Sequence, residues 1–160
     1  MERIDKILNH DLFIEHLRKN KEAEQNRIFC HHDMVHFLDV ARIGEIMNLE
    51  EQVGLNRDLV YAAALLHDMG KHIQYENGTP HEVSGAEIAS RILPDCGYDN
   101  KETDVIVEAI RNHRNPEIAG ERNLCGVLYR ADKASRACFS CEAEKECNWK
   151  GEKKNLTIRY

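Results

Sequence analysis

The sequence predicts an all-α protein in which about six helices form a compact bundle, followed by a short cysteine-rich extension. Apolar residues recur at intervals of three and four along most of the chain, as they do on one face of an α-helix. Sequence signals that start or stop helices flank several of these segments. The alternation of apolar and polar residues that is typical of a strand is absent before residue 155. For residues 155–160 a short strand and an ordered tail are the two alternatives.

The helices are expected at residues 4–24, 33–49, 56–70, 79–93, 99–115 and 121–137. The first carries apolar residues spaced by four, and the third is preceded by Asn56, a good N-cap residue. Thr79, Pro80 and Glu82 start the fourth helix, because they combine a cap, a proline suited to the first turn and a capping-box carboxylate. This helix is expected to end before Pro94.

Length and composition favour one domain with its own core, since 42% of the 160 residues are hydrophobic. The net charge of −6 argues against a broad basic surface for a nucleic acid polymer. We expect no membrane association, because no apolar run approaches the ~20 residues of a membrane span and the charged start lacks a secretory signal. A cytoplasmic protein is therefore expected, with residues 1–137 as the helical domain and 138–160 as a tail packed on it.

Histidines and aspartates occur where the predicted helices should present apolar residues. His36, for example, shares a helical face with Val40, Ile43 and Met47. The six residues of this kind are His36, His67, Asp68, His81, His113 and Asp132. One buried histidine is more often a hydrogen-bonded core residue than a ligand, and one aspartate can cap a helix or pair with a base. Six such groups on five helices instead favour a shared divalent transition metal, which offsets the cost of burying them.

The order His36, His67-Asp68, Asp132 resembles the H…HD…D signature of the HD-domain superfamily of metal-dependent phosphohydrolases. The run Leu-Leu-His-Asp-Met-Gly-Lys around His67 strengthens the resemblance, which extends over residues 28–137. His81 and His113 match the branch with two metals, which includes bacterial dinucleoside tetraphosphate hydrolases. Arg114 stands where the cyclic-di-nucleotide phosphodiesterases have a second histidine, and the residues after Asp132 depart from the tetraphosphatase pattern, so the branch stays open.

The resemblance implies an HD-type bundle and a role for each matching residue. His36, His67, Asp68 and Asp132 would hold one metal, and Asp68 would bridge to a second held by His81 and His113. Iron or manganese is favoured over zinc or nickel, although all four suit imidazole and carboxylate ligands.

Other residues near the signature are candidates for contact with substrate. Lys71 would stabilise charge in the transition state, or would simply be a lysine near a helix end. Arg111 and Arg114 would bind a substrate phosphate, with solvated surface arginines as the alternative. His32 is expected to face the substrate or to support a ligand, and the histidines at 10, 16 and 72 are expected at the surface.

Three cysteines in the extension, Cys138, Cys141 and Cys147, have a spacing that suits a metal site. Cys30 is the candidate fourth ligand, because it precedes the helix of His36 while the extension follows the helix of Asp132. Structural zinc or an iron–sulfur cluster is predicted there. Reduced thiols or a redox-active dithiol are the alternatives.

The predicted function is a metal-dependent phosphohydrolase that cleaves a phosphoester or phosphoanhydride of a small phosphorylated compound, most simply a nucleotide. The alternative is a non-catalytic HD module that binds a metal or nucleotide or senses redox state. A third reading, an oxygenase, is also open. A homodimer is compatible with the sequence.

Overall fold

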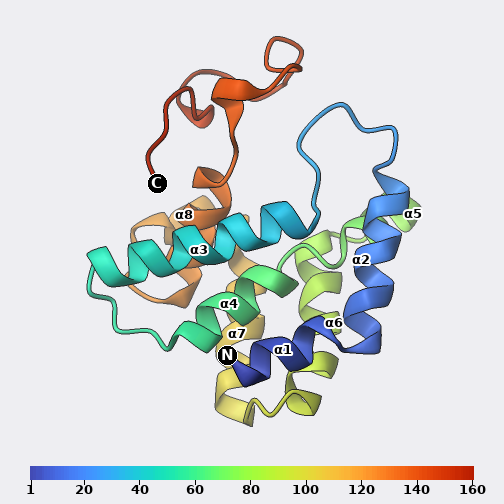
Figure 1. Ribbon diagram of the computed structural model, residues 1–160, viewed down its shortest axis with the longest axis vertical. Helices are drawn as coiled ribbons and strands as arrows, with labels where there is room; N and C mark the ends of the chain where they lie inside the picture. The colour runs from blue at the N-terminus through green and yellow to red at the C-terminus, as the bar shows by residue number, and fades with distance from the viewer.

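A computed structural model describes residues 1–160 and confirms the all-α fold class, with no β-strand (Figure 1). The α-helices are α1 (Glu2–Leu8), α2 (Asp11–Ala23), α3 (Met34–Glu50), α4 (Arg57–Leu66), α5 (Lys71–Asn77), α6 (His81–Asp95), α7 (Asn100–Asn112) and α8 (Leu124–Ala134). Three short 3-10 helices cover Pro116–Gly120, Cys138–Ser140 and Gly151–Lys153. None of the helices has the length and apolar character needed to span a lipid bilayer.

Several helix boundaries differ from the predicted ones for local reasons. The first predicted helix is two helices, because the ring Nδ1 of His10 accepts a hydrogen bond from the backbone N–H of Leu12 and caps α2 (3.2 Å). The third ends at Leu66, and a separate helix, α5, follows the turn at residues 67–70. Asn123 caps α8 through the Gly126 N–H (3.1 Å), which sets the start of that helix later than expected.

Both ends of α6 lie two residues later than predicted. Thr79 does not cap α6, whose N-cap position is Pro80, and the helix continues through Pro94. Proline lacks a backbone N–H donor and usually disrupts the interior of a helix. Pro94 is tolerated because α6 ends one residue later, at Asp95. The capping box at Asp99 and Glu102 is present at the start of α7. Residues 155–160 form neither a strand nor a helix.

Helix α4 lies at the centre of the bundle and packs against α1, α3, α6, α7 and α8. Its inner face consists largely of small residues, the buried run Ala62–Ala63–Ala64 followed by Leu65 and Leu66. Small side chains let several helices approach one central helix closely. As a result, the C-terminal end of α4, where His67 and Asp68 follow, lies in the interior of the protein.

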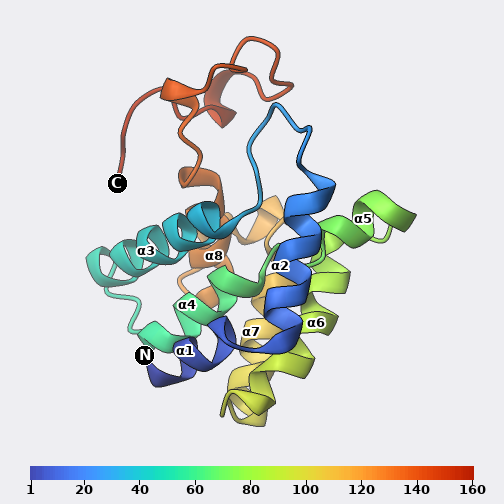
Figure 2. The ribbon, with the colours of Figure 1, turned by 45° about the vertical axis from the view of Figure 1, so that its right-hand side comes forward.

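The extension, residues 138–160, folds back over the C-terminal end of α8, beside the loop that joins α2 to α3 (Figures 1 and 2). Asn155 fixes it there, because its Nδ2 donates hydrogen bonds to the carbonyl oxygens of Lys133 (2.7 Å) and Arg136 (3.0 Å). The Arg136 guanidinium also stacks on the Trp149 ring, 4.8 Å from its centre. These contacts satisfy carbonyls at the end of α8 and hold the extension against the bundle.

His16 and His72 are buried, so the prediction that they lie on the surface is wrong. Helices α2 and α5 face each other at this point, and the two rings meet with Nδ1 of His16 2.8 Å from Nε2 of His72. Each ring thus supplies the polar partner that burial of the other requires. His10 is largely buried as well and acts as a cap, which the sequence pattern did not predict.

Burial, with a smaller contribution from His72, lowers the pKa of His16 to about 4, below its usual value of 6.5. Between these pH values the unfolded chain binds more protons than the folded one, so stability is retained above pH 6.5 and falls as the pH drops toward 4. We predict that His16→Gln reduces this acid-induced loss, measured by urea unfolding at pH 7.5 and 5. The substitution His31→Gln, in an exposed loop, is the control. Equal pH dependence in wild type and His16→Gln would contradict the assignment.

Candidate metal centre

The turn that carries His67 and Asp68 is fixed by contacts from α2 and α6. Asn20 of α2 is fully buried, donates from Nδ2 to the Asp68 carbonyl (2.9 Å) and accepts from the His72 N–H (2.9 Å). On the other side, Gly70 contacts α6 so closely that a Cβ there would lie 2.7 Å from the Gly85 nitrogen and 2.7 Å from the His81 carbonyl oxygen. Glycine at this position therefore allows α6 to bring His81 next to Asp68.

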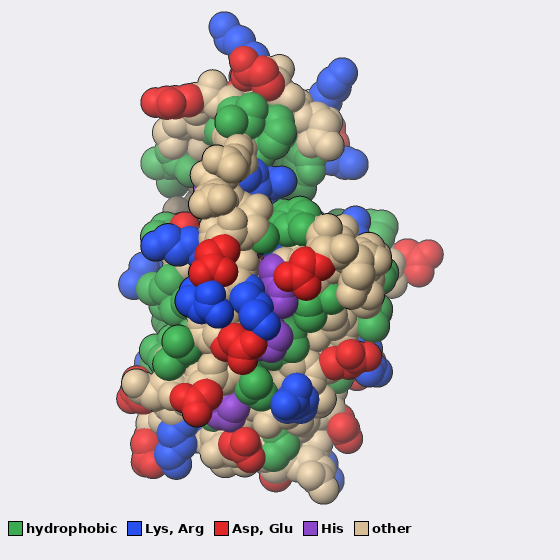
Figure 3. Space-filling model, turned by 90° about the vertical axis from the view of Figure 1, so that its right-hand side faces the viewer, with side chains coloured by type: hydrophobic (Ala, Val, Ile, Leu, Met, Phe, Trp, Pro, Cys, Tyr) green, Lys and Arg blue, Asp and Glu red, His purple; other side chains and the backbone are tan.

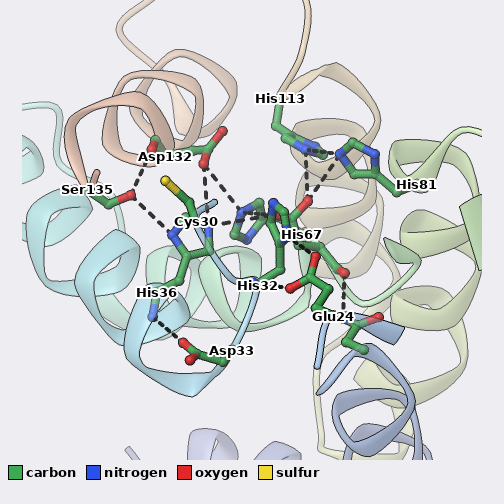
Figure 4. Close-up of polar contacts among 12 residues, drawn as sticks. Glu24, Cys30, His32, Asp33, His36, His67, His81, His113, Asp132 and Ser135 are labelled. Carbon is green, nitrogen blue, oxygen red and sulfur yellow. Dashed lines mark hydrogen bonds and ion pairs between the residues drawn. The ribbon is translucent and has the colours of Figure 1, made fainter. Parts of the chain in front are cut away.

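The buried Asp68 carboxylate lies between two groups of histidines. Figure 4 labels the four histidines, His36, His67, His81 and His113. Its Oδ2 faces Nε2 of His67 (3.1 Å) and of His36 (3.5 Å). Its Oδ1 faces Nε2 of His81 (3.1 Å) and of His113 (3.6 Å). The two oxygens of one carboxylate thus point to separate histidine sets.

These contacts define two candidate metal sites that share Asp68. The potential ligand atoms of His36, His67, Asp68 and Asp132 lie within 4.8 Å of one another, and so do those of Asp68, His81 and His113. All six residues come from the predicted set, and all are buried. The arrangement brings together residues from α3, from the ends of α4 and α7, and from α6 and α8.

Each of the four histidines has its Nδ1 held by an oxygen, which turns Nε2 toward the centre, where the Nε2 atoms of His81 and His113 lie 3.2 Å apart. The partners are the Ala64 carbonyl for His67 (2.7 Å), the Ile110 carbonyl for His113 (2.6 Å), the Gln74 side chain for His81 (2.5 Å) and the Ser135 hydroxyl for His36 (3.3 Å). Because Nδ1–H is donated in each ring, Nε2 is the nitrogen that carries the lone pair once the ring is neutral. Such outer hydrogen bonds are typical of metal-binding histidines.

The residues present fit a divalent metal. Buried Nε2 atoms of His36 and His67 and Oδ1 of Asp68 have no hydrogen-bond partner, which is costly unless an ion satisfies them. Burial opposes a charge on His67, yet the carboxylates of Asp68 and Asp132 raise its pKa to about 9. Burial lowers the pKa of His81 to about 4, so its imidazole is neutral and able to ligate at neutral pH. The surroundings of His67 therefore favour a positive charge, whereas His81 offers a neutral nitrogen.

Two basic side chains hold Asp132 in place. Lys133 Nζ lies 2.5 Å from Oδ2 of Asp132, and an Arg136 nitrogen lies 3.3 Å from Oδ1. Burial would raise the pKa of Asp132, but His67 and these two cations keep it well below its usual range. Asp132 is therefore a carboxylate at neutral pH, ready to bind a cation.

His32 is buried at the edge of the centre, next to a glutamate that the sequence reasoning missed. Nδ1 of His32 lies 2.5 Å from Oε1 of Glu24, and its Nε2 lies 3.7 Å from Oδ2 of Asp68. Tyr75 donates a second hydrogen bond to the same Glu24 oxygen (2.7 Å). Glu24 is almost fully buried, but its sequence neighbours are polar and gave no sign of this. Like the four histidines, His32 thus has its Nδ1 held by an oxygen and its Nε2 turned toward Asp68, but the oxygen belongs to a carboxylate.

The remaining predicted site residues lie at different distances from the centre. Lys71 lines the same cavity as Asp68, and burial lowers its pKa. Arg114 lines the mouth of this cavity and lies 3.5 Å from Glu82. Arg111 is exposed and does not line the cavity.

All six cysteines are free thiols, and both candidate ligand groups consist of histidines and aspartates alone. Cys30 lies beside the metal centre (Figure 4) rather than within a group of cysteines. Burial opposes the charge of the Arg136 guanidinium, but Asp132 and, to a smaller extent, the Cys30 thiol raise its pKa. Lys154 is the basic neighbour of Cys138 and Cys147 in the extension. A structural metal held by cysteines stays a prediction.

A cavity of about 730 Å³ opens from the metal centre to the surface. Figure 3 shows histidine side chains in the middle of this face, next to Lys and Arg side chains and below the extension. The cavity walls come from the bundle and from the extension, which supplies Trp149, Lys153, Asn155 and Arg159 among others. A volume of this size suits a small organic ligand.

Comparisons with known proteins match most of the chain in sequence and in fold. The HD domain family profile matches residues 33–137, which include all six candidate ligands. A crystal structure of a predicted HD superfamily hydrolase from an uncultured Thermotogales bacterium superimposes with a TM-score of 0.59 and 30% identity, covering 76% of this chain and 66% of that one.

Two kinds of relative are similar in sequence. An uncharacterized protein of Clostridium beijerinckii is 48% identical over the full length of both chains. Ribonuclease Y of Frankia alni is 36% identical over 98 residues, and ribonuclease Y of Mesoplasma florum is 26% identical over 132 residues. The similarity covers 61% and 82% of this chain but only 12% and 24% of those ribonucleases.

Gly70→Ala tests whether the contact between Gly70 and α6 positions His81. The added Cβ would force α6 away from the turn, so we predict a loss of about 1–3 kcal/mol of stability and weaker binding at the site of His81 and His113. Urea unfolding and titration with Mn²⁺ measure the two effects. Gly120→Ala is the control, because its Cβ would meet nothing within 4 Å. Wild-type stability and metal stoichiometry in Gly70→Ala would refute this role.

Proposed function

Since this chain belongs to the HD domain family, we propose that it is a metal-dependent phosphohydrolase that cleaves a phosphoester or phosphoanhydride bond of a small phosphorylated compound. A nucleotide is the proposed substrate. The observation that carries this proposal is the position of Asp68, with one oxygen toward each of two ligand sets. A carboxylate placed in this way suits a pair of metals that act together on one phosphoryl group.

The proposed roles follow from the ligand groups. His36, His67, Asp68 and Asp132 would hold one metal, and Asp68, His81 and His113 the other. A bound divalent metal supplies a water of lowered pKa and neutralises charge on the phosphoryl oxygens. Iron or manganese is the proposed metal, in accord with a set of imidazoles and carboxylates.

Other side chains of the cavity would bind and orient the substrate. Lys71 places a cation beside Asp68 and would contact the phosphoryl oxygens. His32 presents Nε2 toward the same carboxylate, held by Glu24, and would accept a hydrogen bond from a group at the reacting phosphorus. Tyr129 and Trp149 give the cavity aromatic surface of the kind that binds a nucleobase.

A phosphodiester is the second candidate substrate. The similarity to two ribonucleases Y supports it, because their name implies cleavage of RNA. A small compound is favoured over a polymer, since the chain is acidic overall and the extension forms part of the cavity wall.

Hydrolysis of p-nitrophenyl phosphate and bis-p-nitrophenyl phosphate by the protein with Mn²⁺ or Fe²⁺ tests the proposal and separates monoester from diester. We predict that Asp68→Asn lowers the rate by about a thousandfold, because the shared ligand charge is lost. Lys71→Met should lower kcat by about a hundredfold with metal binding retained. Asp104→Asn, at an exposed site, is the matched control and should keep the wild-type rate.

Failure to release p-nitrophenol or phosphate from these esters and from a nucleotide panel would contradict the phosphohydrolase. Tight nucleotide binding without turnover would instead support a non-catalytic sensor. Circular dichroism of each variant checks that the helices are intact.

A further inference from the structure

The cavity above the metal centre is strongly basic although the chain as a whole is acidic. Eight of its lining residues are Lys or Arg against three Asp or Glu, while the net charge of the chain is −6. The eight are Arg27, Lys71, Arg114, Arg130, Lys133, Arg136, Lys153 and Arg159, and the acidic three are Asp68, Asp132 and Glu152. Such concentration of one charge in a concave site attracts an anion of opposite charge.

Most of the basic residues contributed by the bundle already have a partner. Lys133 and Arg136 pair with Asp132, Arg130 pairs with Glu51 (2.6 Å), and Arg114 lies near Glu82. Arg27 donates to the Cys30 carbonyl (2.9 Å). Lys71 is therefore a cation of the bundle that stays available to a ligand at the metal centre, and Arg27, whose partner is an uncharged carbonyl, keeps its charge as well.

The extension adds two further cations to the wall of the cavity. Lys153 and Arg159 line the cavity, are exposed to solvent and pair with no carboxylate. The backbone around Lys153 is held on both sides, because Asn155 donates to the carbonyls at the end of α8 and Trp149 stacks on Arg136. Arg159 follows Asn155 by four residues. The extension lies outside residues 33–137, so this wall is not part of the matched family region.

We propose that Lys153 and Arg159 form a second anion-binding subsite, which selects substrates with a condensed phosphate chain over simple monophosphates. This inference rests on the proposed function, in which the metal centre and Lys71 bind the phosphoryl group that is cleaved. A single phosphate at the centre would leave the basic wall of the extension without a ligand, whereas a chain of phosphates would reach from one to the other across the cavity. Inorganic polyphosphate and the phosphate chain of a nucleotide share this chemistry.

Isothermal titration calorimetry of the 160-residue chain, loaded with Ca²⁺ to keep the metal centre occupied without turnover, tests the subsite. The probes are orthophosphate, inorganic tripolyphosphate, a non-hydrolysable ATP analogue and a short oligoribonucleotide with a 5′-hydroxyl. We expect tripolyphosphate to bind about tenfold more tightly than orthophosphate. The double variant Lys153→Ala/Arg159→Ala should lose this preference.

Lys145→Ala/Lys150→Ala is the matched control, because it removes the same charge from exposed positions of the extension that do not line the cavity. It should keep the preference for tripolyphosphate. An equal loss in both double variants, or no preference in the wild type, would overturn the subsite. Tighter binding of the oligoribonucleotide than of tripolyphosphate would also overturn it.

The two remaining ligands distinguish the source of the phosphate chain. Binding of the ATP analogue at least as tight as that of tripolyphosphate indicates a nucleotide, and weaker binding indicates inorganic polyphosphate. Hydrolysis of p-nitrophenyl phosphate by the metal-loaded wild type is measured separately, so a failure of the proposed function leaves the calorimetric result readable.

Discussion

The structure depends on one buried carboxylate, that of Asp68, which lies between imidazoles from four helical segments. Burial raises the free energy of its charge, and His67 and His32 nevertheless keep its pKa well below the usual range. A buried anion of this kind is tolerated only when opposite charge and hydrogen-bond partners surround it. Protonated His67 provides opposite charge in the absence of a metal. A divalent cation would replace this proton and bind the Nε2 atoms of the surrounding histidines, whose Nδ1 atoms are held by oxygens.

The rest of the bundle positions this group. The small residues of α4 allow five helices to pack around it, so that its last turn ends in the interior. Asn20 ties the following turn to α2, and Gly70 lets α6 come close enough to place His81. Packing and ligand geometry are therefore coupled, because the same contacts that stabilise the fold set the distances between the ligands.

The convergence of the six candidate ligands could be predicted from the sequence, because each lies on the apolar face of a regular helix or next to a helix end. Helical periodicity reports which way such a side chain points, and the order of the residues resembles a known signature. Glu24 could not be found in this way, since it follows the end of α2 and its burial depends on the later loop that brings His32 to it. The burial of His16 and His72 and the separate helix α5 likewise depend on contacts between distant segments. Periodicity within one helix does not reveal such contacts.

Metal occupancy tests this account most directly. Crystals grown with excess Mn²⁺, with anomalous scattering measured at the manganese edge, should show two peaks in each molecule. One peak should lie among His36, His67, Asp68 and Asp132, and the other among Asp68, His81 and His113. Absence of any peak at Asp68 under saturating metal would contradict the account, and so would ions bound only at the surface.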